Sequence, residues 1–255
     1  MSKRDIVWSY GGGVQTTAIL VLVAKGILEK PTRVVMSNTS RERSLVWKYI
    51  VNYTLPLMDS LGMSLEIVPH SYSAVDLYSL KGELLLPAFT QTGKLNTFCS
   101  TEWKLRAVRR YLREIGYGPN NKITQWLGMS LDEVHRMRTS DVNWIDLHYP
   151  LIFDVRKRRH ECLLLIKDFG LPKPPKSACY MCPFLDDDEW IEERDETPED
   201  FEKAIELYQE IRDNDIAKGR TGVYIHRGLQ PLNETTFVPS KQTPMEQVCG
   251  DTCWT

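Results

Sequence analysis

A run of three glycines between two apolar segments constrains the fold of this chain more than any other feature. Ile6-Val7-Trp8 precedes Gly11-Gly12-Gly13, and an apolar segment from Ala18 to Ala24 follows. This order predicts a buried strand, a sharp turn and the N-terminus of a helix. Glycine lets the backbone approach a ligand closely, and the unpaired N–H groups of a helix N-terminus suit a phosphate. A loop that uses glycine for connectivity alone is the alternative.

Polar residues follow the predicted strands at one edge of a predicted sheet. Strands are expected over 33–36, 63–68 and 123–127, and helices over 14–25, 42–61, 100–115, 154–169 and 197–218, with a short helix within 78–86. This alternation predicts an α/β fold, a Rossmann-like parallel sheet flanked by helices, with right-handed crossovers. Ligands of such sheets lie beyond the carboxyl ends of the strands. Asn38, Thr39 and Glu42 would lie there beside the glycine turn.

The loop after the strand 123–127 is a second candidate segment at that edge. Gly128 begins it, Ser130 and Glu133 form a capping box, and Arg136 and Arg138 follow. Capping alone accounts for Ser130 and Glu133. The two arginines have the planar guanidinium fork that suits a sulfate or phosphate.

Composition and charge narrow the class of protein. The 255 residues are 42% hydrophobic and carry a net charge of −2, so no global basic field points to a nucleic acid. Two local basic faces are a solvated surface or a nucleic-acid contact: Arg106, Arg109, Arg110 and Arg113, and the run Arg156–Arg159. We find no signal peptide and no membrane span, so a cytoplasmic protein without a membrane partner is expected.

The cysteines indicate metal or redox chemistry. Cys179 and Cys182 form a C-x-x-C pair, which is ambiguous between a redox dithiol, zinc and an iron–sulfur cluster. Cys99 comes just before a predicted helix, where the helix dipole would lower the pKa of its thiol. Cys249 and Cys253 lie in the tail, and Cys162 falls among apolar residues and is expected in the core.

A stiff segment divides the chain. Residues 170–176 contain three prolines between Gly170 and Lys176. We therefore expect a nucleotide-binding domain over 1–170 and a cysteine-rich helical extension with its tail over 171–255, packed on the first domain.

Together these motifs resemble the PP-loop (N-type ATP pyrophosphatase) superfamily, nearest to its phosphoadenosine-phosphosulfate reductase-like branch. Residues 11–16 correspond to the family's S-G-G-x-D-S loop, and 38–42 to its D-T-G-x-E turn. Cys99 with Lys104 is similar to its C-T…K element, and 128–136 to its G-x-x-x-D-E-x-x-R segment. Tyr149-Pro150-Leu151 followed by the C-x-x-C pair has the family's order. The resemblance implies an adenine nucleotide alpha hydrolase-like fold.

The resemblance also implies the site. Its nucleotide-binding residues would be the positions that match or flank the motifs: Ser9, Gly11, Gly12, Gly13, Gln15, Thr16, Thr17, Asn38, Thr39, Glu42, Gly128, Arg136 and Arg138. Lys104 would hold the sulfate or phosphate, and Cys249 would be the nucleophile. Cys99, Cys179, Cys182 and Cys253 would hold a [4Fe–4S] cluster, with zinc as the alternative. Cys249 and Cys253 could exchange roles.

The implied function is that of a reductase-like enzyme that binds ATP or a sulfonucleotide and acts in sulfur transfer or reduction, with an electron-donor protein as its partner. Two alternatives keep the fold. One is ATP-dependent adenylation or thiolation of a nucleic acid, and the other is a non-catalytic subunit that binds a nucleotide and a cluster. Gly11, Gln15 and Asn38 replace the family's Ser, Asp and Asp. Main-chain N–H groups and Thr16 are therefore the expected phosphate ligands, in preference to Mg²⁺. The oligomeric state is left open.

Overall fold

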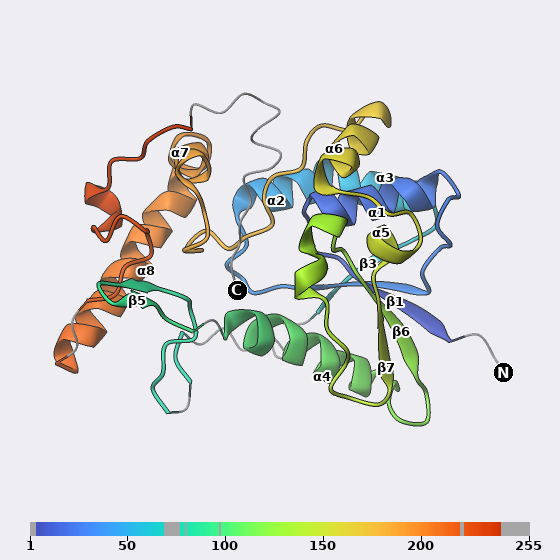
Figure 1. Cartoon of the computed structure of the whole chain (residues 1–255), viewed down its shortest axis with the longest axis horizontal. Coiled ribbons are helices and arrows are strands. Elements are labelled where there is room, and N and C mark those ends of the chain that lie inside the picture. Colours follow the sequence, from blue (N-terminus) through green and yellow to red (C-terminus); the bar gives the residue numbers. More distant parts are fainter. Residues whose placement is uncertain (1–3, 69–76, 80, 97, 220–221, 241–255) are drawn as a thin grey trace. The chain divides into compact units, whose positions relative to one another are not determined.

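The fold contains a five-stranded parallel sheet. The computed structural model describes residues 4–68, 77–79, 81–96, 98–219 and 222–240 (Figure 1). The strand order is β3-β2-β1-β6-β7, and every neighbouring pair is parallel. The bounds are β1 Asp5–Ser9, β2 Arg33–Ser37, β3 Leu65–Val68, β6 Ile123–Leu127 and β7 Ile145–His148. This order confirms the predicted Rossmann-like α/β class. A separate antiparallel pair joins β4 Phe89–Thr90 to β5 Gly93–Lys94.

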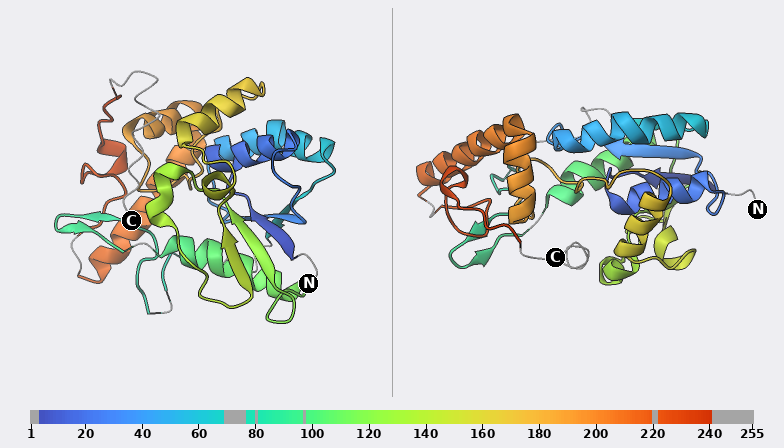
Figure 2. Two further views of the ribbon diagram at one scale, coloured as in Figure 1. Left: turned by 45° about the vertical axis from the view of Figure 1, so that its right-hand side comes forward. Right: turned by 90° about the horizontal axis from the view of Figure 1, so that it is seen from above.

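Helices cover both faces of the parallel sheet. They are α1 Val14–Ala24, α2 Ser44–Tyr49, α3 Leu55–Ser60, α4 Arg106–Glu114, α5 Pro150–Phe153 and α6 Arg159–Asp168. Side chains of α1, α3, α5 and α6 share one apolar cluster with the sheet, whereas α4 packs in a different cluster. The helices α1 and α3 lie over one face of the sheet and α4 lies over the opposite face (Figures 1 and 2). The described residues also form α7 Asp187–Glu196, α8 Pro198–Ala217 and two 3₁₀ helices, η3 Leu131–Arg136 and η4 Leu232–Glu234. The sequence predicts α8 but neither α7 nor β7.

Three predicted helices differ in the structure. The helix expected over 42–61 contains a π-helical segment, Ile50–Thr54, so that Pro56 falls in the first turn of α3, where its missing N–H costs no hydrogen bond. The helix expected over 100–115 likewise begins with a π-helical segment, Ser100–Leu105. The helix expected over 154–169 begins only at Arg159, as α6, because Arg156 has a positive φ of 50°, and α5 ends before that range, at Phe153.

The short helix expected within 78–86 is wrong. Tyr78 and Leu84 instead form an isolated antiparallel bridge. Gly82 has a φ of +76°, and the Ser79 N–H donates to the Glu83 carbonyl across the turn. A glycine in the left-handed region favours such a tight turn over a helix.

The chain forms two compact units whose boundaries differ from the predicted division at residue 170. The first contains 1–38, 46–73 and 105–177 and therefore holds the parallel sheet. The second contains 39–45, 74–104 and 178–255. The second unit takes segments from the N-terminal half because its apolar core draws on residues 77–103 as well as on α7 and α8. Connectivity along the sequence gives no sign of this exchange.

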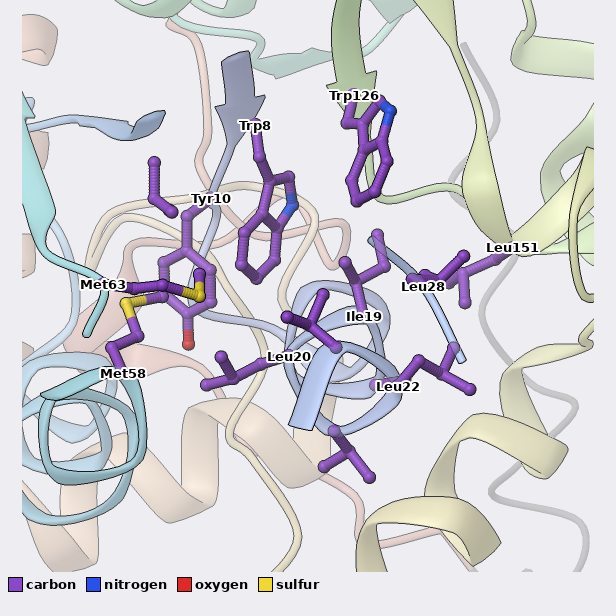
Figure 3. Close-up of a cluster of buried hydrophobic side chains, with 14 of the residues drawn as sticks. Trp8, Tyr10, Ile19, Leu20, Leu22, Leu28, Met58, Met63, Trp126 and Leu151 are labelled. Atoms are coloured by element: carbon purple, nitrogen blue, oxygen red, sulfur yellow. The ribbon is translucent and has the colours of Figure 1, made fainter. Parts of the chain in front are cut away.

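The core of the first unit explains the all-apolar sequence of α1. Every residue from Thr16 to Val23 is buried, so the helix has no solvated face. Trp8 and Trp126 on neighbouring strands pack over Ile19 and Leu20 of α1 (Figure 3). The second unit has its own core around Trp190, Tyr208 and Ile211. Among the described residues, we find no helix with the length and apolarity needed to cross a membrane.

Candidate functional site

The glycine loop follows β1 at the point where the order of the sheet reverses. The chain passes from β1 outward through β2 to β3 and then returns to β6 on the other side of β1. Ser9 lies opposite Val35 of β2 and Leu127 of β6, so the loops after these strands leave the same edge. Open α/β sheets bind ligands in the crevice at such a switch point. Within the first unit, the predicted gathering of the glycine loop, Asn38 and Gly128 at one edge is therefore confirmed.

The three glycines of the loop differ in how much room a side chain would have at each position. Gly12 has a φ of +77°, and a Cβ there would lie 2.7 Å from Val46 Cγ1. At Gly13, the N-cap of α1, a Cβ would lie 3.1 Å from the Ser177 Cβ. A Cβ at Gly11 would make only an ordinary contact, 3.6 Å from the Ser177 Oγ. Packing therefore accounts for Gly12 and Gly13, and Gly11 is the position that packing does not explain.

Thr16 caps its own helix. Its hydroxyl donates to the Gly13 carbonyl at 3.0 Å and accepts from the Gly13 N–H at 3.2 Å. A hydroxyl has a single proton to donate, so this arrangement leaves none for a phosphate. Gly128 packs on the same residue, since a Cβ at Gly128 would lie 2.7 Å from Thr16 Cγ2. The structure thus gives Thr16 and Gly128 roles in closing the helix N-terminus.

Gln15 is held between two charged side chains. Its Nε2 donates to Glu133 Oε2 at 3.0 Å, and its Oε1 accepts from Arg159 Nη1 at 3.2 Å. Glu133 also accepts from Arg136 and from the Ser130 N–H, so its charge is balanced by donors on every side. The sequence does not single out Arg159, which the tertiary structure brings from the start of α6. A carboxylate at position 15 would lie beside Glu133, which like-charge repulsion disfavours.

The other predicted residues of this unit lie around the same edge with different partners. The Ser9 Oγ accepts from Gln125 Nε2 at 2.7 Å, and Thr17 is buried in α1. The Arg138 N–H donates to the Tyr149 hydroxyl, and this hydroxyl donates to the Arg138 carbonyl. The side chain of Arg138 is exposed.

The second unit holds a polar cluster around the turn that follows β2. Thr39, fully buried, donates to Glu42 Oε1 at 3.2 Å and lies 3.6 Å from the Cys179 Sγ. Lys104 Nζ pairs with the same Glu42 oxygen at 3.2 Å. Glu42 and Cys179 are also opposite each other in an isolated antiparallel bridge. The fold therefore brings Thr39, Glu42, Lys104 and the C-x-x-C segment together, as the sequence motifs predict but no spacing along the chain requires.

The charges in this cluster act on one another. Attraction to Glu42 raises the pKa of Lys104, and Cys179 and Cys182 contribute to the same shift. Burial raises the pKa of the Cys179 thiol. The predicted lowering of the Cys99 pKa is wrong, because burial raises it and the attraction of Lys104 only partly opposes that effect. Cys162 lies fully buried in the core of the first unit, as expected, and burial raises its pKa to about 12.

The described thiols do not by themselves make a metal centre. Across the residues that the structure describes, no three His, Cys, Asp or Glu side chains are grouped so that they could hold a metal ion. The C-x-x-C segment does form a tight turn, in which the Cys182 N–H donates to the Cys179 carbonyl at 3.0 Å. Cys249 and Cys253 lie outside the described residues.

A buried ion pair, which the sequence does not predict, anchors the turn that follows β2 and carries Glu42. Arg43 is fully buried, and its Nε lies 2.6 Å from Oε2 of the equally buried Glu193 on α7. Its Nη2 reaches Glu192 at 2.9 Å. The next residue, Ser44, donates its N–H to Asp200 of α8. The segment that carries Glu42 is thus fixed to both long helices of the second unit.

Comparison with known proteins bears on the fold. The chain is similar in structure to a phosphoadenylyl-sulfate (PAPS) reductase from Candida auris, solved as a phosphate complex. The match covers 68% of this chain and 76% of that chain, with a TM-score of 0.45 and 11% identity. Neither the family models nor the curated proteins give a match. The fold assignment above rests on the observed sheet order and not on this likeness.

Proposed function

We propose that this chain is a phosphoadenosine-phosphosulfate reductase-like enzyme that binds an adenine nucleotide at its glycine loop. The observation that carries the proposal is the position of the loop, at the switch point of the β3-β2-β1-β6-β7 sheet and at the N-terminus of α1. The first-turn N–H groups of α1 would bind the phosphate. Thr16 is committed to capping, so the expected side-chain ligands are the exposed Arg136 and Arg138.

Sulfur chemistry in this proposal belongs to the second unit. Cys179 and Cys182 lie in the electrostatic reach of Lys104, whose side chain is 42% exposed and pairs with Glu42. Lys104 would hold a sulfur-bearing anion near these thiols, as a point charge with three donors. Cys249, outside the described residues, is the proposed nucleophile. An electron-donor protein would complete a reductive cycle.

The proposed [4Fe–4S] cluster depends on the tail. A cluster or a structural zinc needs four ligands, and the described residues alone do not fit either of them. We therefore derive no step of the reaction through a metal. Cys253 is the proposed fourth ligand beside Cys99, Cys179 and Cys182, and metal analysis of the full chain tests this directly.

Titration calorimetry of the full chain with ATP and with a sulfonucleotide tests the nucleotide site. The Gly11→Ala variant should fold, because its Cβ would make an ordinary contact, yet the methyl group would occupy the loop surface. We expect its nucleotide affinity to fall at least about tenfold, or about 1.4 kcal/mol. Gly118→Ala is the matched control, since Gly118 lies in open space. Equal affinities for the two variants would argue against the loop as the site.

A further inference from the structure

Two segments that are separate in the sequence form one basic surface in the first unit. The Leu131 N–H donates to the Lys157 carbonyl at 2.9 Å, and the Arg159 N–H donates to the Asp132 carboxylate. These bonds place the segment 131–138, which begins with the 3₁₀ helix η3 Leu131–Arg136, beside the start of α6. We call the resulting patch the arginine surface, and its cationic members are Arg136, Arg138, Arg156, Lys157, Arg158 and Arg159.

Part of the arginine surface is paired within the chain, since Arg136 pairs with Glu133 and Lys157 pairs with Glu161 at 3.4 Å. Asp132 accepts from the Ser130 hydroxyl as well as from Arg159, and Asp154 pairs with His148 at 2.8 Å. Glu161 accepts from the Arg158 N–H at 2.8 Å. The Arg156 and Arg158 side chains are exposed, and within the described part of the chain neither guanidinium has a carboxylate partner. Positive charge on this surface is therefore available to an external anion.

The other basic face of the sequence is different. On α4, Arg109 makes a bidentate pair with Asp141 and keeps only 17% of its side chain exposed. Arg106 and Arg110 also have interactions within the chain. The two basic segments look alike in the sequence but differ in the structure. Arginines of α4 have partners within the chain, whereas the Arg156 and Arg158 side chains before α6 are exposed to solvent.

An exposed aromatic ring lies at the edge of the arginine surface. Phe153, at the end of α5, is 55% exposed and precedes Arg156 by three residues. Val134 on the facing loop is 51% exposed. Arginines bind the phosphates of a nucleic acid, and an exposed ring stacks on bases that are not paired. From this combination we propose that the arginine surface binds single-stranded nucleic acid.

The surface adjoins the glycine loop, since Gln15 contacts both Glu133 and Arg159. A bound strand would pass beside the proposed nucleotide site. The inference stands on the charge and exposure of this surface, and it holds whether or not the glycine loop binds a nucleotide. It names a macromolecular partner for the same unit.

Fluorescence anisotropy of a labelled oligothymidylate with the full chain tests the proposal. Binding should weaken linearly with the logarithm of salt concentration. The double variant Arg156→Ala/Arg158→Ala removes two phosphate contacts, which should lower the salt slope by about 1.4 and the affinity at 0.1 M salt by about 25-fold. Lys25→Ala/Lys167→Ala is the control. It changes the charge equally at exposed positions, at the C-terminal ends of α1 and α6.

The base contribution needs a second comparison. Phe153→Leu should reduce the affinity for oligothymidylate by roughly 5- to 100-fold and leave the affinity for an abasic oligomer unchanged. The proposal is overturned if the wild-type chain binds no oligomer, if both double variants bind equally, or if the abasic oligomer binds as tightly as the base-bearing one. Binding to anionic lipid vesicles or to an acidic peptide in place of the oligomer would also overturn it. Calorimetry with ATP on Arg156→Ala/Arg158→Ala separates this result from the nucleotide site, whose affinity should be unchanged.

Discussion

Replacing Arg43 by methionine should destabilise the second unit, and the cost should depend on pH. The side chains of Arg43 and Glu193 are both fully buried, with 0% of either accessible to solvent. Burial raises the pKa of Glu193 to about 8, against the attraction of Arg43. Removing one partner of a buried pair costs about 3–5 kcal/mol, because the other must then be buried as an unpaired charge or take up a proton. The full cost should appear at pH 9, where Glu193 is ionised in the wild-type chain.

The sign of the pH dependence follows from the direction of the pKa shift. Without Arg43, the folded-state pKa of Glu193 rises further, so the folded variant holds a proton that the wild-type chain has released above pH 8. Each pH unit in that window costs the variant about 1.4 kcal/mol relative to the wild type. At pH 6 the carboxyl is protonated in both, and the cost reduces to a missing hydrogen bond, about 1–3 kcal/mol.

Urea unfolding at the two pH values measures this difference. Near-UV circular dichroism reports on Trp103 and Trp190, which are buried in the core of the second unit. Arg43→Met/Glu193→Gln should lose the pH dependence, because it removes the carboxyl together with its partner. Arg194→Met on the same helix should leave stability unchanged, since the Arg194–Asp195 pair is on the surface. A cost for Arg43→Met that is equal at both pH values, or larger at pH 6, would refute the reasoning.

Three further results are expected. Gly12→Ala should reduce the free energy of unfolding by about 1–3 kcal/mol and so lower the thermal midpoint, because its Cβ would lie 2.7 Å from Val46 Cγ1 and its φ is +77°. A midpoint equal to that of the wild type would contradict the tight packing. Cys162 should resist alkylation at pH 8 in the folded chain, because burial raises its pKa to about 12, and peptide mass spectrometry after labelling measures this. The chain purified without oxygen should contain iron and a visible absorbance band that bleaches on reduction, and Cys179→Ser and Cys253→Ser should lose the iron while Cys162→Ser keeps it. A colourless chain with zinc would refute the iron–sulfur assignment.

The sequence predicts most of the strands of the first unit. Apolar runs bounded by glycine or polar turns give β1, β2, β3 and β6 and their order along the chain, because strand and helix periodicity is local. The polar residues after each strand then fall at one edge of a parallel sheet, which identifies the glycine loop and Gly128. β7 is missed, since only one side of Ile145–His148 is buried and its residues alternate too briefly to predict a strand.

The sequence alone determines the α/β class, the glycine turn before α1 and the buried position of Cys162, since each depends on residues close together in the chain. Only the tertiary structure decides which distant side chains meet. It holds Gln15 between Glu133 and Arg159, and it buries Arg43 against Glu193. It also leaves Arg156 and Arg158 outward while Arg109 is paired. The hydrogen bonds in these contacts join residues that are more than 30 positions apart in the sequence. Local propensity depends on neighbouring residues and therefore cannot predict them.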